Sequence, residues 1–78
     1  MNSLAVKLDP LAVDVSLSDE ALHVTLADGR EISAPLAWFP RLHNATQEQR
    51  QAWRLIGGGV GIHWDGVDED ISIEGLLK

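Results

Sequence analysis

A run of glycines is the first pattern in this sequence that could do chemistry, because glycine-rich loops bind phosphate groups. The run consists of Gly57–Gly59 and Gly61. A phosphate loop needs a helix that begins directly after the glycines, and a P-loop also needs a lysine followed by serine or threonine. Here we expect a helix before the glycines and a strand after them, and no lysine stands between Lys7 and Lys78. The run therefore predicts a reversal of chain direction rather than a phosphate site.

Carboxylates and imidazoles form the second group, since they bind metal ions and transfer protons. The segment Asp65–Asp70 is rich in carboxylates, but its spacing does not match the ligand positions of an EF-hand. His23, His43 and His63 lack the spacing that places metal ligands on one helix face. A solvated acidic turn is the interpretation we favour, with a weak divalent-cation contact as the alternative. The serines also lack a nucleophile motif, so we predict no catalytic residues, no metal and no cofactor.

Adjacent aromatic residues form the third group. Trp38, Phe39, Pro40 and Arg41 follow one another in a segment expected to connect two elements. Neighbouring aromatic side chains cannot easily both face a core there, and Trp and Arg are common anchors of protein interfaces. We predict that Trp38, Phe39 and Arg41 bind a partner protein; the alternative is that Trp38 and Phe39 cover a small core. The predicted charged rim of this site consists of Asp65, Asp68, Glu69 and Asp70.

Three strands are the first elements expected to position these residues. Apolar and polar residues alternate over residues 13–17 and 22–26, which is the period of a half-buried strand, and residues 31–34 form a third run. Asp19-Glu20 suits a tight turn between the first two strands. Asp28-Gly29 predicts a two-residue type I′ turn between the second and the third. Pro35 ends the third strand because it has no N–H for the ladder.

One main helix is predicted to begin at Thr46 and to end at Gly57. Thr46 and Gln49 have the spacing of a capping box at its start. An apolar stripe follows, formed by Ala52, Trp53, Leu55 and Ile56. A helix of this length is unstable alone in water, so we expect the stripe to pack on the sheet with Trp53 in the core.

Shorter elements complete the predicted fold. Residues 35–44 would form a rigid connection, because Pro40 fixes its own backbone and disfavours a helical conformation at the residue before it. Residues 62–64 would form a short strand, and the C-terminal segment either a short strand over residues 71–73 or one helical turn after Ser72. A further edge strand over residues 4–8 stays undecided. Together these elements predict an α+β fold of two layers, in which an antiparallel β-meander packs against one main helix.

Composition limits the classes to which the chain can belong. Its 78 residues predict one small domain over residues 1–78. Twelve Asp and Glu against six Lys and Arg make it acidic, so we expect no direct binding to nucleic acid. Without cysteine it can form neither a disulfide nor a thiolate metal site. No stretch reaches the length of a membrane span or a signal peptide, so we expect a cytoplasmic protein with no membrane contact.

An ordered set of motifs resembles the small bacterial domain-of-unknown-function family 2442. The motifs cover Leu26–Ile32, Pro35–Leu42, Ala45-Thr46 with Trp53, Ile56–Trp64 and Asp68–Leu77. The resemblance implies a compact α+β domain of the kind found alone, beside another small gene, or joined to a helix-turn-helix domain. That setting implies regulatory or antitoxin-like partners. It supplies no catalytic residues to carry over.

We therefore predict a non-catalytic protein-interaction module with a regulatory, antitoxin-like role and another protein as its partner. The first alternative is an acidic inhibitor that occupies a basic, nucleic-acid-binding groove of a partner protein. The second is a divalent-metal-dependent enzyme built on the acidic turn and His63. Open sheet edges and an apolar connection also predict a two-fold homodimer.

Overall fold

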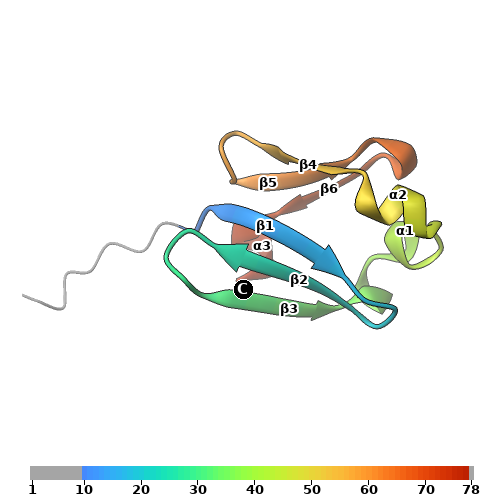
Figure 1. Cartoon of the computed structure of the whole chain (residues 1–78), viewed down its shortest axis with the longest axis horizontal. Helices are drawn as coiled ribbons and strands as arrows, with labels where there is room; N and C mark the ends of the chain where they lie inside the picture. The colour runs from blue at the N-terminus through green and yellow to red at the C-terminus, as the bar shows by residue number, and fades with distance from the viewer. Residues whose placement is uncertain (1–9, 78) are drawn as a thin grey trace, which may run out of the picture.

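The computed structural model describes residues 10–77, which form two antiparallel three-stranded sheets and several short helices (Figure 1). The first sheet has the order β1-β2-β3, with strands Ala12–Leu17, Ala21–Leu26 and Glu31–Pro35. The second has the order β4-β5-β6, with strands Trp53–Ile56, Gly61–Trp64 and Glu69–Ser72. The undecided strand over residues 4–8 lies outside the described residues.

The first sheet follows the predicted alternation, with one interruption in β1. Leu22, Val24 and Leu26 of β2 all point into the core and are buried. In β1 the pairing register shifts between Ala12 and Asp14, which is a β-bulge. A bulge inserts one extra residue and changes which side chains face inward. Val13, expected to face the core, is therefore 54% exposed, and Ala12 is buried in its place.

Both turns of the first sheet occur where they were predicted, but the second has another geometry. The Ser18 hydroxyl accepts hydrogen bonds from the N–H groups of the tight turn that follows it. At the second turn, the N–H of Leu26 donates to the carbonyl of Arg30 over 2.8 Å, so the loop holds three residues. Gly29 has a φ of 93°, whereas Asp28 keeps a negative φ. The predicted type I′ turn is therefore wrong, because that turn needs positive φ at both residues; a three-residue loop ending in a positive-φ glycine is the next common type.

The Gly29→Val substitution is expected to destabilise this hairpin. A Cβ at Gly29 would meet no atom within 4 Å, so the whole effect comes from the backbone conformation. A β-branched residue is strained at positive φ, and we expect a loss of about 1–3 kcal/mol in the free energy of unfolding. Urea titration followed by circular dichroism measures it. Gly29→Asn is the control and should lose less, because Asn tolerates positive φ better; an unchanged urea midpoint for the valine variant would contradict the assignment.

The connection after Pro35 is more helical than predicted. It contains the 3₁₀ helix η1 over Leu36–Trp38 and the helix α1 over Pro40–His43, with Pro40 at the first helical position. Proline is accepted there because that N–H has no partner within the helix. Leu36 and Leu42 are both fully buried and anchor the two helices in the core.

The predicted main helix is mostly wrong. The capping box is confirmed: Thr46 Oγ1 accepts from the N–H of Gln49, and Gln49 Oε1 accepts from the N–H of Thr46. However, the helix α2 spans Gln47–Gln51 only, and residues 53–56 form β4. Trp53 pairs with Trp64 of β5, and Leu55 pairs with Ile62. The apolar residues of this segment therefore follow the two-residue repeat of a strand and not the repeat of a helix.

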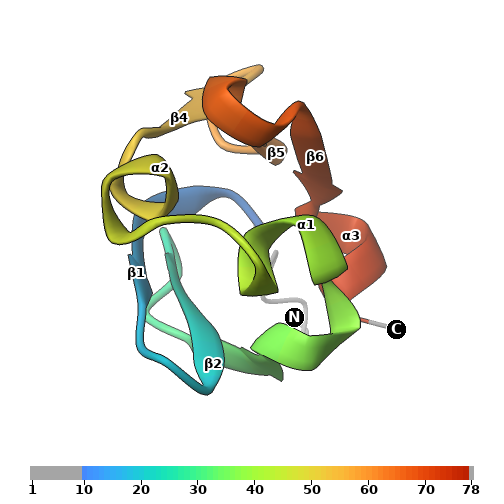
Figure 2. The same cartoon turned by 90° about the vertical axis from the view of Figure 1, so that its right-hand side faces the viewer.

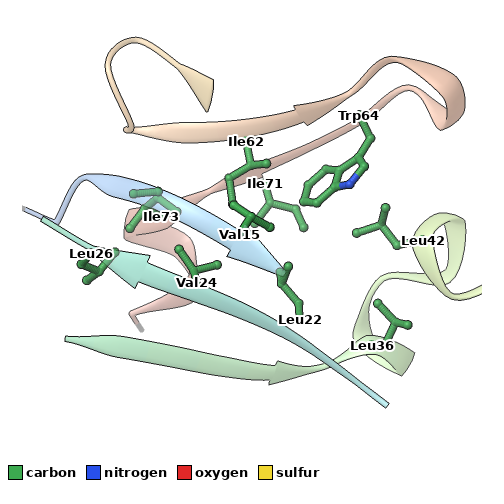
Figure 3. Packing of buried hydrophobic residues seen from close by; sticks show 11 residues of the cluster. Val15, Leu22, Val24, Leu26, Leu36, Leu42, Ile62, Trp64, Ile71 and Ile73 are labelled. Carbon is green, nitrogen blue, oxygen red and sulfur yellow. The ribbon is translucent and has the colours of Figure 1, made fainter. Parts of the chain in front are cut away.

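Several side chains of both sheets share one hydrophobic core (Figure 3). Val15 of β1 lies toward Ile62 and Ile71 of the second sheet. Trp64, at the end of β5, is fully buried, and its Nε1 donates to the carbonyl oxygen of Arg50 over 3.0 Å. Trp53, which was predicted to lie in the core, is only half-buried and packs against it, and Trp64 is the fully buried tryptophan.

The short helices close one end of the molecule, where α1 and α2 lie across the two sheets (Figure 2). The Arg50 side chain links them, because Nε donates to the carbonyl of Leu42 and Nη2 donates to the carbonyl of His43. These carbonyls lie in the last turn of α1, where few backbone partners remain, and the Leu42 carbonyl also accepts from the N–H of Ala45 over 3.1 Å. None of the helices in the described part of the chain is long and apolar enough to cross a membrane.

The C-terminal segment contains both of the predicted alternatives in sequence. Strand β6 ends at Ser72, and the helix α3 over Ile73–Leu76 begins directly after it. The Ser72 hydroxyl accepts from the N–H of Gly75 and so caps this helix. The mixed α+β class is thus confirmed, but two small sheets with short helices replace the single meander and single main helix.

Candidate functional site

The two predicted aromatic anchors at the end of η1 differ in their exposure to solvent. Trp38 is 68% exposed, whereas Phe39 is half-buried and packs against the core. The turn is held on both sides by buried leucines, Leu36 and Leu42, and the N–H of Leu36 donates to the carbonyl of Glu20 over 2.8 Å. Trp38 is therefore not a core cover but an exposed aromatic side chain on a well-anchored turn.

Arg41 has an intramolecular partner that the sequence did not indicate. Its Nη1 donates to the carbonyl oxygen of Asp68 over 2.7 Å and so links α1 to the residue before β6. Asp68 has a φ of 51°, a left-handed conformation that is uncommon for residues other than glycine. The guanidinium thus helps to hold β6 beside η1.

A groove of about 310 Å³ lies between η1 on one side and β6 with α3 on the other. Four of the predicted interaction residues line it: Trp38, Phe39, Glu69 and Asp70. Its lining residues are Trp38, Phe39, Glu69, Asp70, Ile71, Ser72, Gly75 and Leu76. The structure therefore brings the aromatic pair and part of the acidic turn to one place, although they are about thirty positions apart in the sequence.

Asp65 and Asp70 belong to a charged cluster on the outer face of the second sheet. His63 lies opposite Arg54 of β4 and opposite Asp70 of β6, so the three side chains form a row across the strands. His63 Nε2 is 2.7 Å from Asp65 Oδ1, and His63 Nδ1 is hydrogen-bonded to Asp70 Oδ1. Arg54 Nε is 3.5 Å from Asp65 Oδ2. Asp65 and Asp70 thus both pair with the imidazole, and Asp65 also pairs with the guanidinium, while both carboxylates stay largely exposed to solvent.

The sequence alone does not indicate the role of His63. A cross-strand row depends on the register between strands, and the register was unknown because β4 had been expected to be helical. The same row does not favour a metal site, since it places the Arg54 guanidinium beside Asp65. Among residues 10–77, no group of three or more His, Cys, Asp or Glu is arranged to hold a metal ion. His23 likewise has a partner, Ser33 Oγ, at 2.8 Å from its Nδ1.

The two carboxylates raise the pKa of His63 above its ordinary value of 6.5. The hydrogen bond with Asp70 is the largest cause, and the charges of Asp70 and Asp65 add to it; together they outweigh partial burial and the charge of Arg54. A raised pKa in the folded state means that folding favours protonated His63. The resulting stabilisation is complete below pH 6.5 and is lost as pH rises through the folded-state pKa.

The His63→Gln substitution is therefore expected to flatten the dependence of stability on pH between about pH 6 and pH 8. NMR titration of the wild-type imidazole signals should place the pKa of His63 above 6.5. Urea titrations at several pH values measure the stability of both proteins. His43→Gln, at an exposed position in α1, is the matched control and should retain the wild-type profile. A wild-type profile for His63→Gln would show that the cluster does not couple to folding.

The glycine run reverses the chain direction, as predicted, but it joins the two strands β4 and β5. The predicted helix does not extend to it. Gly57, Gly58 and Gly59 all have positive φ values, of 59°, 73° and 115°. Gly57 is therefore part of a hairpin turn and not the end of a helix. The run has no helix after it, so the structure places no phosphate loop there.

Comparison with known proteins rests on this whole arrangement of strands. A family model described as "Protein of unknown function (DUF2442)" matches residues 12–78. The chain belongs to this family. The DUF2442 match begins at the first residue of β1 and so includes all six strands. The resemblance of the sequence motifs is thereby confirmed.

A crystal structure of a protein of unknown function from Rhodospirillum rubrum ATCC 11170 is similar to this DUF2442 chain. The two are 29% identical, with a TM-score of 0.75, over 90% of this chain and 87% of the other. No protein with a curated description matches the chain. The comparisons thus support the fold and the family, and the function must be argued from the site.

Proposed function

We propose that this DUF2442 domain is a non-catalytic protein-interaction module with a regulatory role, and that the groove between η1 and β6 binds the partner. The observation that carries the proposal is the exposed Trp38 side chain at the edge of this groove. Tryptophan dominates binding energy at interfaces more than most residues do.

Rigidity of the site supports the same proposal. The turn that carries Trp38 is fixed by buried Leu36 and Leu42, and Arg41 ties α1 to the residue before β6. A site that is already ordered loses less conformational entropy when a partner binds. The groove would thus bind a protein segment without first having to fold.

An antitoxin-like role is the specific form of this proposal, in which the groove would hold a segment of the partner and block its action. A second candidate uses the charge of the same region. Glu69 and Asp70 line the groove and make it acidic, as an inhibitor of a basic, nucleic-acid-binding groove would need. Binding dominated by charge would weaken steeply with salt, whereas binding through Trp38 would not.

The Trp38→Ala substitution tests the proposal. Exposed side chains contribute little to stability, so we expect the free energy of unfolding to change by less than about 0.5 kcal/mol. Loss of an aromatic anchor should weaken partner binding by about 30-fold or more, which corresponds to about 2 kcal/mol. Capture from the native host, quantified by mass spectrometry, finds the partner, and titration calorimetry measures the affinity.

Val60→Ala is the matched control, since Val60 is 54% exposed and lies outside this groove. It should bind the partner as the wild type does. Two outcomes would contradict the proposal. If Trp38→Ala unfolds the domain, Trp38 is structural; if it binds the partner with unchanged affinity, the groove is not the site.

A further inference from the structure

The free edge of β6 borders the same groove. β6 has β5 as a neighbour on one side and no strand on the other within the described sheet. The N–H of Ile73 donates to the carbonyl of Val60 on the β5 side over 3.0 Å. Backbone groups alternate in direction along an antiparallel strand, so the N–H of Ile71 also points to β5. The N–H groups of Asp70 and Ser72 therefore point away from β5, toward the free edge.

We propose that the partner supplies an extended, cationic segment that adds to β6 as an antiparallel strand. This inference rests on the proposed function and names the chemistry of its partner. Strand addition takes affinity from main-chain hydrogen bonds and specificity from alternate side chains. The free edge of β6 offers main-chain hydrogen bonds, and the side chains on its two faces offer specificity.

The two faces of β6 predict an alternating pattern in the added segment. Asp70 and Ser72 are exposed on the outer face, and Ile71 between them is buried. In antiparallel pairing, a residue opposite Asp70 places its side chain beside the Asp70 carboxylate. The next residue faces the inner side, where Phe39 and Leu76 are half-buried at the groove. A basic residue followed by an apolar residue therefore fits this edge.

Charge favours such a partner over a second copy of this chain. Glu69 and Asp70 lie on β6, and Glu74 lies on the helix that follows. Two copies paired through β6 would bring these carboxylates together, and like charges on facing strands destabilise a sheet. The net charge of −6 adds a general repulsion between copies. The homodimer expected from the sequence, if it forms, would use another edge.

The probe for this inference is a short capped peptide of alternating lysine and valine, added to the ¹⁵N-labelled full chain. We expect slower amide hydrogen exchange at Asp70 and Ser72, whose N–H groups would gain an acceptor. The amide of Ile71 already points to β5 and should change little. A peptide with glutamate in place of lysine should not bind. Equal binding of both peptides would overturn the charge requirement and with it the proposal.

Substitutions at Ser72 isolate its backbone N–H. Ser72 has a φ of −82°, close to the value of proline, and proline is accepted at strand edges where the N–H faces solvent. Ser72→Pro removes the N–H and the hydroxyl cap, whereas Ser72→Ala removes the hydroxyl cap alone. We expect the peptide to bind Ser72→Pro about tenfold more weakly than Ser72→Ala, as the loss of one strand hydrogen bond implies. Equal affinities would overturn strand addition.

Methylation of the peptide backbone gives an independent test. In antiparallel pairing with lysine opposite Asp70, the lysine amides point to β6 and the valine amides point away. N-methylation of the lysines should abolish binding, and N-methylation of the valines should not. If the lysine-methylated peptide binds with the same affinity as the unmethylated peptide, the proposal is overturned. Exchange protection at Asp70 and Ser72 that rises with protein concentration alone would also overturn it, because β6 would then pair with a second copy.

These outcomes are separable from those of the proposed function. If Trp38→Ala weakens the natural partner but Ser72→Pro and Ser72→Ala bind that partner equally, the groove is the site and the strand edge is not. If Trp38→Ala binds the natural partner normally, the proposed function fails whatever the peptide does.

Discussion

Replacing Trp64 with alanine is expected to unfold most of the protein. The side chain is fully buried between β5 and the short helices, and its Nε1 donates to the Arg50 carbonyl. Truncation of a buried tryptophan costs about 3–5 kcal/mol. A domain of this size holds only about 4–12 kcal/mol at typical values per residue. Urea titration followed by far-UV circular dichroism should show a large fall in the unfolding midpoint.

Trp53→Ala is the matched control for this prediction. Trp53 is half-buried and packs at the edge of the same core, so its loss should cost clearly less than the loss of Trp64. The helical stripe predicted Trp53 in the core, whereas the structure places Trp53 at its edge and buries Trp64 fully. A Trp64→Ala variant with a well-dispersed amide spectrum and a near-native midpoint would show that this core is misassigned.

The Gly59→Ala substitution has the second largest expected effect. Gly59 has a φ of 115°, and a Cβ there would lie 2.5 Å from the carbonyl oxygen of Ala12 and 2.9 Å from its nitrogen. Both are backbone atoms, which cannot move aside as the end of a side chain can. Backbone strain and overpacking each cost about 1–3 kcal/mol, so we expect a loss of about 2–5 kcal/mol. The substitution would also disturb the hydrogen bond from the N–H of Ala12 to the Gly59 carbonyl.

Gly58→Ala separates the two causes of that loss. Gly58 also has a positive φ, of 73°, but a Cβ there would meet no atom within 4 Å. It should therefore show the backbone strain without the collision, and its unfolding midpoint should lie between those of the wild type and Gly59→Ala. Equal midpoints for the two variants would mean that β1 moves away from the turn at no cost.

The first sheet could be predicted from the sequence because its signals are local. Leu22, Val24 and Leu26 alternate with more polar residues, and Asp28-Gly29 marks the turn that follows. The bulge at Val13 could not be predicted, because it depends on how β1 meets β2. The predicted type of the second turn is wrong for a similar reason, since a two-residue loop and a three-residue loop can both contain the same Asp-Gly pair.

The second sheet was half missed because one short segment fits two periods. The capping box at Thr46 correctly marked a helix start, and Trp53, Leu55 and Ile56 then fitted an apolar helical stripe. Trp53 and Leu55 also fit the alternation of a strand, and pairing with β5 decides between the two. Tertiary contacts commonly override local propensity in this way.

At the candidate site, too, residue types could be recognised from the local sequence, whereas contacts between distant residues could not. Trp38 and Phe39 could be singled out by their types and by the prolines on both sides, but only the fold shows that one is exposed and the other half-buried. The contact of Arg41 with Asp68 joins residues 27 positions apart, and no local pattern indicates it. His63 needed the register of three strands before its two carboxylate partners could be recognised.

Both sheets pair each strand only with its neighbours in the sequence, and this has a consequence for the order of folding. Hairpins between adjacent strands form within about 1–10 μs, so each sheet can begin to assemble by itself. Joining the sheets requires contacts such as Ala12 with Gly59, which close a loop of nearly fifty residues. Closing a long loop costs entropy before it brings any stabilisation. We therefore expect the docking of two nearly complete sheets, and not the formation of either sheet, to limit the folding rate.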